Sequence, residues 1–196
     1  MKLFVFAMES EAKDVLADFK CIEKKPFSIY KKDNCLVTIT GIGKVNAAMV
    51  LTNILTRFKI EHIYNLGFAG IFSDKYKIGD LLEITNAKYH DFDLTVFGYK
   101  LGQVPNMPAI YKSNIISDHP KIGLLTGDYF MTNKPNQETM VDMEGAALYQ
   151  VAHLFGKKIS SFKIVSDIIG KSSVKDYREF ESKGSLYFKK IVDNLL

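Results

Sequence analysis

The stretch from Val141 to Asp167 constrains the fold more than any other part of this chain. It opens Val-Asp-Met-Glu-Gly-Ala-Ala, continues as an apolar segment with helical spacing, and closes with a short apolar strand that ends at Ser166-Asp167. Glu144 therefore lies at the start of the predicted helix, and Asp167 lies at the end of the predicted strand. In open α/β sheets ligands bind beyond the carboxyl ends of strands, and a buried carboxylate is costly unless it is paired. The pattern predicts a strand-helix-strand unit that carries a site.

Strand-like runs alternate with amphipathic helix-like runs, and no linker, repeat or low-complexity stretch interrupts them. The predicted strands are residues 3–6, 27–30, 35–40, 62–66, 81–85, 122–126 and 159–165, the second and third pairing across a turn at 31–34. The predicted helices are residues 8–19, 41–58, 143–155 and 176–196, and residues 86–120 are aromatic and irregular. This alternation predicts a single α/β domain over residues 1–196, a three-layer sandwich around a mixed, largely parallel sheet.

Composition and charge argue against several classes of protein. The chain is 47% hydrophobic and 24% charged, as expected of an ordinary globular domain. The apolar run at residues 2–7 is too short for a signal peptide, and no window approaches the ~20 apolar residues of a membrane span. Cys21 and Cys35 lack metal-ligand spacing and indicate free thiols in a reducing cytoplasm. The net charge is only +4 and the lysine doublets are scattered, so no nucleic-acid surface is expected.

Arginine is scarce in this chain. Arg57 and Arg178 are the only two, and arginine is the preferred bidentate partner of phosphate. A site that used inorganic phosphate as the nucleophile would have few arginine side chains with which to bind it. The scarcity favours water as the nucleophile.

Four further motifs precede the Val141–Asp167 unit. They are Ala7-Met8-Glu9-Ser10-Glu11, the segment Gly41-Ile42-Gly43-Lys44-Val45-Asn46-Ala47-Ala48, the segment from Tyr89-His90-Asp91 through Phe97-Gly98-Tyr99 to Gly102-Gln103-Val104-Pro105, and Gly127-Asp128. With these motifs in this order, the chain resembles the purine nucleoside phosphorylase superfamily and, within it, the methylthioadenosine/S-adenosylhomocysteine nucleosidases. Each motif alone is weak evidence for the family, but together the motifs extend over nearly the whole chain. The resemblance implies a nucleoside phosphorylase-like fold.

The resemblance also implies the chemistry, which is cleavage of a purine–ribose bond without a cofactor or a metal. It implies that Asp167 is the acid toward the purine N7, Glu144 the acceptor for the ribose hydroxyls and Glu11 the base for water, the usual pattern of inverting hydrolysis. From the residues alone, other interpretations stay open. Asp167 also fits a helix or turn cap, and Glu144 fits a first-turn glutamate favoured by the helix dipole. Periodicity does not choose between Glu9 and Glu11, so a solvated helix face remains possible for either.

Further residues match the nucleoside contacts of the family. The resemblance implies that Phe130 stacks on adenine beside Met131, that Met143 packs against the sugar, and that Ser166 holds the purine edge or Asp167. Local pattern also fits core roles, because Met143 continues an apolar helical stripe and Tyr129 and Phe130 are ordinary core residue types.

Two polar motifs resemble a phosphate-binding loop and a metal site, but their spacing supports neither. Gly41-Ile42-Gly43-Lys44 lacks the spacing of a phosphate-binding P-loop, so we interpret it as a glycine turn that opens a helix. His90, Asp91 and Asp93 have no partner at metal-ligand spacing. We therefore expect no metal site, and the resemblance implies a structural role for that segment near a subunit contact.

The chain departs from the family pattern at three places. Phe68 stands where the family has a small hydroxyl residue, which could crowd the pocket near the water and the sugar. Lys163 stands where the family has an arginine, which keeps the charge but loses the planar fork. A helix of the family is missing, because residues 113–120 lead almost directly to the strand at Ile122.

The leading hypothesis is hydrolysis of the N-ribosyl bond of an adenine nucleoside such as 5′-methylthioadenosine or S-adenosylhomocysteine. A futalosine-type nucleosidase and a catalytically impaired nucleoside-binding protein remain alternatives, the second because of Phe68 and Lys163. A phosphorylase is disfavoured by the scarcity of arginine. The resemblance further implies a homodimer, in which the aromatic segment 97–108 covers the pocket of a neighbouring subunit.

Overall fold

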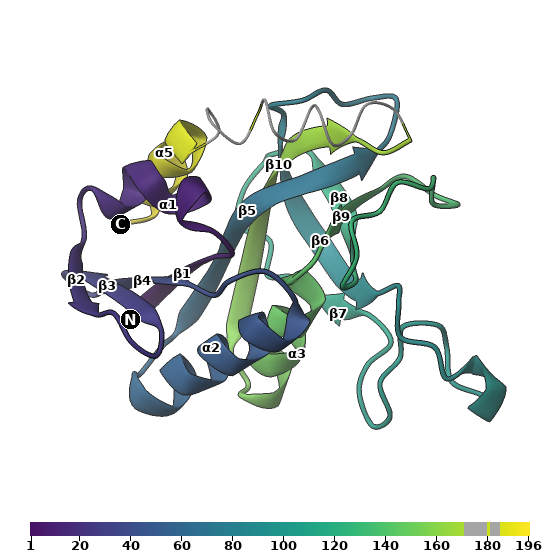
Figure 1. Cartoon of the computed structure of the whole chain (residues 1–196), viewed down its shortest axis with the longest axis horizontal. Coiled ribbons are helices and arrows are strands. Elements are labelled where there is room, and N and C mark those ends of the chain that lie inside the picture. Colours follow the sequence, from purple (N-terminus) through teal and green to yellow (C-terminus); the bar gives the residue numbers. More distant parts are fainter. Residues whose placement is uncertain (171–179, 181–184) are drawn as a thin grey trace.

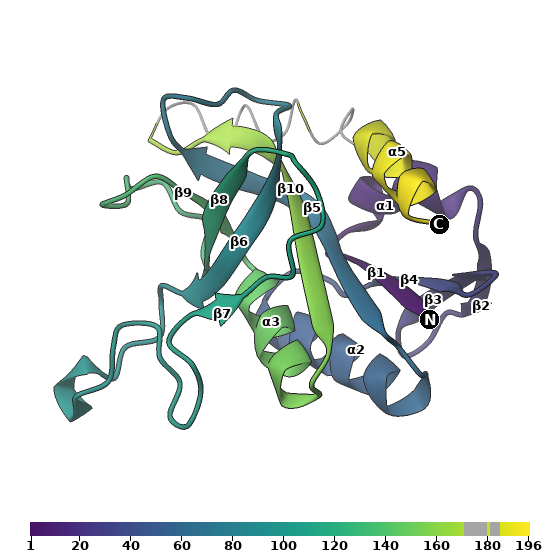
Figure 2. The ribbon, with the colours of Figure 1, turned by 180° about the vertical axis from the view of Figure 1, so that it is seen from behind.

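A mixed sheet of ten strands organises the part of the chain that the computed structural model describes, which is residues 1–170, 180 and 185–196. The strands are β1 (Lys2–Phe6), β2 (Lys20–Glu23), β3 (Ser28–Lys32), β4 (Cys35–Ile39), β5 (His62–Phe72), β6 (Leu81–Tyr89), β7 (Tyr111–Lys112), β8 (Lys121–Thr126), β9 (Thr139–Asp142) and β10 (Lys158–Ile168). Their order is β10-β6-β8-β9-β5-β1-β4-β3-β2, with β7 on β6. Because β10 also pairs with β5, the strands β5, β10, β6, β8 and β9 close into a ring (Figures 1 and 2).

Parallel and antiparallel contacts are equally common in this sheet. Five of the ten described strand pairings are parallel and five are antiparallel. The mixed α/β fold is therefore confirmed, whereas the largely parallel arrangement is confirmed only in part. The antiparallel pairs β10–β6 and β5–β9 close the ring. The tight turn at Asp33, which has a φ of 49°, makes β3 and β4 antiparallel neighbours as predicted.

Helices cover both faces of the sheet. They are α1 (Glu9–Leu16), α2 (Lys44–Arg57), α3 (Gly145–Leu154) and α5 (Ser185–Leu195), with a short 3-10 helix η1 (Thr95–Phe97). Alternation along β1 sends Leu3 and Val5 into the core shared with α2 and α3. Phe4 and Phe6 point the other way, into the core shared with α1 and α5. In Figure 1, α2 and α3 lie on one side of β5 and β10, and α1 and α5 on the other.

Most predicted elements are present, with shifted ends. The strands β5 and β6 run further than predicted, to Phe72 and Tyr89, and β2, β7 and β9 are additional strands. Residues 113–120 form neither helix nor strand. This agrees with the prediction that a helix of the family is absent there. Of the predicted closing helix at residues 176–196, residues 185–195 are helical as α5, whereas 176–179 and 181–184 lie outside the described residues. Within the described part, no helix is both long and apolar enough to cross a membrane.

Candidate active site

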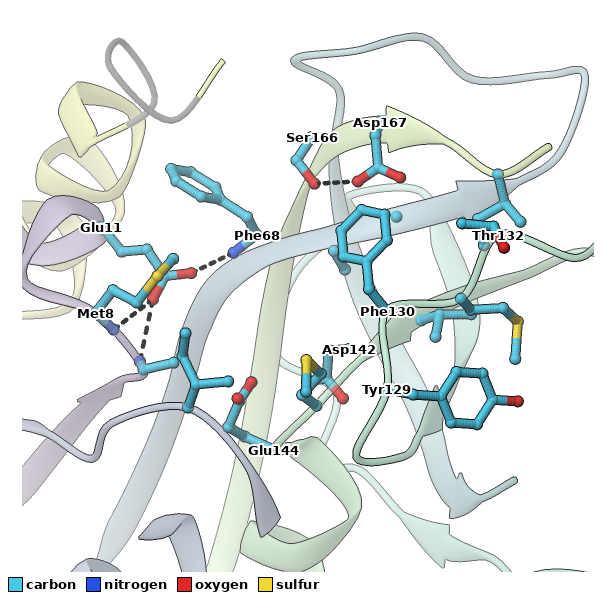
Figure 3. Close-up of a pocket in the computed structure, with 18 residues that line it drawn as sticks. Met8, Glu11, Phe68, Tyr129, Phe130, Thr132, Asp142, Glu144, Ser166 and Asp167 are labelled. Carbon is cyan, nitrogen blue, oxygen red and sulfur yellow. Dashed lines mark hydrogen bonds between the residues drawn. The ribbon is translucent and has the colours of Figure 1, made fainter. Parts of the chain in front are cut away.

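A cavity of about 570 Å³ lies where six separate segments meet (Figure 3). The start of α1, the turn before α2, the middle of β5, the loop after β8, the junction of β9 with α3 and the end of β10 all border it. The lining residues are Ala7, Met8, Glu11, Ile42, Phe68, Ala69, Gly70, Tyr129, Phe130, Met131, Thr132, Val141, Asp142, Met143, Glu144, Ser166, Asp167 and Ile169. Every predicted site residue except Lys163 is among them. Residues far apart in the sequence therefore meet around one space.

Glu11 is drawn into the cavity wall by backbone donors. Its Oε2 accepts hydrogen bonds from the N–H groups of Ala7 and Met8, each at 3.0 Å, and its Oε1 accepts one from the N–H of Phe68 at 2.8 Å. These bonds hold the carboxylate over the first turn of α1, and only 2% of the residue is exposed. Burial raises the pKa of Glu11, against the opposing influence of Lys163 and the three N–H groups. A buried carboxylate with increased proton affinity suits a general base.

Glu144 occupies the N-cap of α3 and reaches across to α2. Its Oε1 accepts a hydrogen bond of 2.8 Å from the N–H of Gly43, which itself caps α2 with a φ of 99°. Burial, and secondarily the negative charge of Asp142, raise the pKa of Glu144 to about 7. Glu144 is thus a buried carboxylate that changes its charge near neutral pH.

Asp142 is a buried residue of the cavity that sequence reasoning did not single out. Its Oδ1 accepts a 2.6 Å bond from the hydroxyl of Thr126, and both carboxylate oxygens accept the N–H of Gly145, at 3.1 and 3.0 Å. Its Oδ2 also lies 2.9 Å from Lys163 Nζ. The only local signal was its place at the end of an apolar strand before a helix. Its partners come from other elements and could not be predicted locally.

Lys163 lies behind the cavity wall rather than on its surface. Its Nζ forms the ion pair with Asp142 and lies 3.5 Å from Asn65 Oδ1. A Cβ at Gly67 would lie 2.9 Å from Glu11 Oε1 and 3.2 Å from Lys163 Nζ, so both groups crowd the same glycine. Burial opposes the charge of the ammonium, but Asp142, Glu11 and Glu144 outweigh it and raise the pKa of Lys163. The lysine therefore remains a cation beside the buried carboxylates.

Ser166 and Asp167 both face the cavity because of a β-bulge in β10. The pairing with β5 shifts between Val165 and Asp167, which leaves Ser166 as the extra residue. The Ser166 hydroxyl donates a 2.8 Å hydrogen bond to Asp167 Oδ1, and both residues are almost fully buried. A Cβ at Gly70 would lie 2.9 Å from Asp167 Oδ2, so the glycine makes room for the carboxylate.

An aromatic and apolar wall borders the opening of the cavity. Tyr129, Phe130 and Met131 follow β8 on a loop, and the two rings are 51% and 42% exposed. This exposure argues against plain core roles for the two aromatic residues. Met143 lines the cavity beside Glu144, with intermediate burial.

Phe68 borders the cavity without filling it. Its ring packs against Phe180 and Phe188, with centroids 5.3 and 5.5 Å away, and belongs to the core beneath α5. Figure 3 shows this ring directed away from Phe130. The crowding that the sequence raised as a concern is therefore not observed, because the phenyl side chain has joined the core.

Metal-binding geometry is not found among the described residues, which contain no group of three or more His, Cys, Asp or Glu side chains suited to a metal ion. The buried carboxylates of the cavity are instead balanced by Lys163 and by backbone N–H groups. The cavity therefore presents buried carboxylates beside an apolar wall.

Comparison with known proteins gives a consistent result. The sequence model of the phosphorylase superfamily matches residues 3–119 and 129–196. The 5′-methylthioadenosine/S-adenosylhomocysteine nucleosidase of Bacillus pumilus is 33% identical over 183 residues, which span 81% of this chain and 79% of that protein.

Solved structures agree with the sequence relatives. A Borrelia burgdorferi protein assigned to the same nucleosidases and bound to adenine superimposes with a TM-score of 0.87 at 31% identity, over 98% of this chain and 97% of that one. The nucleosidase of Neisseria meningitidis in complex with methylthio-immucillin-A gives a TM-score of 0.88 at 26% identity, over 97% of this chain and 96% of that one.

Proposed function

This chain belongs to the 5′-methylthioadenosine/S-adenosylhomocysteine nucleosidase family of the phosphorylase superfamily, and on that premise we propose that it hydrolyses the N-ribosyl bond of such adenine nucleosides to adenine and a ribose derivative. The observation that carries the proposal is the meeting of Glu11, Glu144 and Asp167 around one cavity. Figure 3 shows the three carboxylates arranged around the same space. Hydrolysis with inversion needs an acid and a base on different sides of the sugar.

Asp167 acts as the acid toward the departing purine in this proposal. Its buried position and the hydroxyl of Ser166 fix the carboxyl at the end of the cavity formed by β10. A group held in this way can donate a proton, or a strong hydrogen bond, as the bond to ribose breaks. Phe130 and Met131 border the same space and offer an apolar surface for the flat purine ring.

Glu144 holds the ribose in this proposal, with Met143 packed beside it. An ionised carboxylate accepts hydrogen bonds from two neighbouring hydroxyls and stabilises the positive charge that develops on the sugar. Glu11 activates the attacking water. Its three N–H donors fix the direction of the carboxylate. Lys163 supplies a nearby positive charge that partly offsets the repulsion between the buried carboxylates.

Water is the proposed nucleophile because the described lining contains no arginine. Arg57 lies at the end of α2, where it donates to Glu23 and Asn53 on the surface. Arg178 lies outside the described residues. A phosphate ion at the cavity would therefore lack the bidentate partner that it prefers among the residues that the structure describes.

We also propose that residues 1–196 act as one domain and that two copies form a dimer. The first strand pairs with β5 and the last helix packs on α1, so the two ends of the chain share one core. The segment between β6 and β7 projects from the body (Figure 2) and exposes Val96 by 83% and Phe97 by 74%. Exposed apolar side chains on a projecting segment favour contact with another protein surface.

A cytoplasmic location completes the proposal. Cys21 and Cys35 both carry free thiols in the structure, and Cys35 is buried in β4. Free thiols of this kind are typical of proteins that work in a reducing compartment.

Incubation with 5′-methylthioadenosine, with and without phosphate, tests the proposed reaction. We expect free adenine at the same rate in both samples, measured by chromatography. Adenine that appears only with phosphate would instead indicate a phosphorylase. Binding of the nucleoside without release of adenine would indicate a protein that binds but does not cleave.

A further inference from the structure

Three charged residues outside the cavity link two of the segments that border it. Lys44 begins α2, Asp91 follows β6 and Asp128 follows β8. Lys44 Nζ lies 2.7 and 2.6 Å from the two carboxylate oxygens of Asp91 and 3.5 Å from Asp128 Oδ2. The backbone N–H of Lys44 donates to Asp128 Oδ1 at 2.9 Å, and that of Asp128 donates to Asp91 Oδ2 at 2.8 Å. The three residues therefore form a closed ring of contacts.

Each side of this ring is next to a group of the proposed site. On one side, Lys44 follows Gly43, whose N–H donates to Glu144 at 2.8 Å. On the other side, Asp128 precedes Tyr129 and Phe130, which line the cavity. A shift of the ring would move the donor to Glu144 and the aromatic wall relative to each other.

We propose that Lys44, Asp91 and Asp128 form a clamp that positions the loop at residues 129–132 against Glu144, and so act as positioning residues for the purine part of the substrate. The inference rests on the proposed function, because it assigns the purine to this loop. None of the three side chains needs to touch the substrate. Their effect is transmitted through Gly43 and through the first residues of the loop.

The loop is held at both of its ends and by Met131, whose side chain packs against the buried cluster that contains Ile169. Residues 129–138 belong to neither a helix nor a strand, and the two aromatic rings are too exposed to be fixed by core packing alone. The far end is tied by Glu138, which accepts hydrogen bonds from Ser73 and Lys75 at 3.1 and 2.8 Å. At the near end, Tyr129 also packs edge-on against His90, with ring centroids 4.8 Å apart. Lys44, Asp91 and Asp128 supply the charged contacts at this end of the loop.

The clamp differs from an ordinary surface ion pair. An isolated exposed pair contributes little to stability, but the side chains of Lys44 and Asp91 are only 22% and 16% exposed. The carboxylate of Asp91 uses both oxygens toward Lys44 and also receives a backbone N–H. Contacts that combine charge, two oxygens and backbone donors fix geometry as well as energy.

Ligand binding by the intact protein tests the clamp. For Lys44→Met, we expect the dissociation constant of free adenine, measured by calorimetry, and KM for 5′-methylthioadenosine each to rise by about tenfold. We expect kcat at saturating substrate to stay within about threefold of the parent, because Glu11 and Asp167 are untouched. The variant Asp91→Asn keeps the shape of the side chain and should weaken adenine binding in the same direction. The double variant should cost little more than Lys44→Met alone.

Arg57→Met is the matched control. It removes an exposed ion pair at the other end of the same helix, with Glu23, and should leave adenine binding unchanged. If Lys44→Met and Asp91→Asn bind adenine as the parent does and lose only thermal stability, the clamp is structural and the proposal is overturned. Should Lys44→Met fail to fold by circular dichroism, Asp91→Asn decides the question in the same way, and Lys44→Arg, which keeps the positive charge, should bind adenine more tightly than Asp91→Asn does.

Failure of the proposed function would be recognised separately. If the parent protein released no adenine from 5′-methylthioadenosine, the proposed reaction would be wrong. The adenine affinities of parent and variants would still report on the clamp, because they require no turnover.

Discussion

Lys163 Nζ lies 2.9 Å from Asp142 Oδ2, with both side chains almost completely removed from solvent. The proposed base, Glu11, and the proposed ribose ligand, Glu144, both raise the pKa of the lysine. Removing one partner of such a buried ion pair strongly destabilises the fold, because the other charge is left buried without compensation. The pair therefore links the stability of the fold to the chemistry of the cavity.

Lys163→Met should both destabilise the protein and impair turnover. Removing one partner of a buried pair costs about 3–5 kcal/mol, and here three carboxylates would lose their cation. Urea unfolding measures the free energy, and adenine release measures kcat. Lys163→Arg, which keeps the charge, is the control and should retain more of both. Equal stability of Lys163→Met and the parent would contradict the importance of the pair.

Asp167→Asn should remove turnover while the fold remains intact. The substitution keeps the shape of the side chain but cannot donate a carboxyl proton, and general acid catalysis contributes about 10²–10⁴-fold. Adenine release measures the loss, and thermal unfolding checks the fold. Ser166→Ala, which removes only the hydrogen bond to Oδ1, should cost much less. A parent-like rate in Asp167→Asn would refute the assignment of the acid.

Gly67→Ala should lower kcat through a displaced Glu11. The added Cβ would lie 2.9 Å from Glu11 Oε1 and 3.2 Å from Lys163 Nζ, so the carboxylate must move. Misplacing a catalytic group by about 1 Å can cost about 10²-fold in rate. Gly123→Ala is a matched control in β8, because its nearest neighbour is a side-chain atom of Asn86 at 3.4 Å. Equal rates for the two variants would show that Glu11 is not confined as the structure indicates.

The Val141–Asp167 unit could be predicted from the sequence because its signal is local. Apolar runs with strand and helix periods gave β10 and α3, and the carboxylates at their ends line the cavity. The choice of Glu11 over Glu9 was not local. Glu9 is exposed and Glu11 is buried, and the difference depends on the N–H of Phe68, which lies 57 residues away in the sequence.

Long-range geometry explains what the sequence could not predict. The period of a strand sends Ser166 and Asp167 to opposite faces, and only the bulge against β5 brings both to the cavity. Asp142 gained its role from Thr126 and Lys163, which lie on other strands. The ring of strands, in which β10 pairs with both β5 and β6, likewise depends on strands that are distant from each other in the sequence. Two of the antiparallel pairs that make the sheet less parallel than predicted, β10–β6 and β5–β9, belong to that closure.

The charge of Glu144 should control the pH dependence of activity. Its pKa is raised to about 7, and the ionised form is the better acceptor for ribose hydroxyls. We expect kcat/KM to fall as the pH drops below about 7, because kcat/KM reports groups of the free enzyme. Glu144→Gln should lower activity and flatten this limb of the profile. An unchanged acidic limb in Glu144→Gln would assign the titration to another group.

The same residue should lower stability as the pH rises. A raised pKa in the folded state means that folding binds protons, so the stabilising contribution is complete below the unfolded pKa of 4.5 and is lost as the pH rises through about 7. Urea unfolding of the parent between these values should therefore show a decline that Glu144→Gln reduces. A decline of the same size in both proteins would contradict the assignment.

The projecting segment around Phe97 should hold two copies of the chain together. Sedimentation of the parent should give twice the chain mass of 22.2 kDa. Phe97→Asp places a charge on a side chain that is 74% exposed in the single chain. Because that charge would have to be buried in a dimer, we expect dissociation to monomers. Ile22→Asp, on the distant strand β2 and 45% exposed, is the control and should leave the dimer intact. A parent protein that sediments as a monomer at micromolar concentration would contradict the dimer and, with it, a role for this segment in covering a neighbouring cavity.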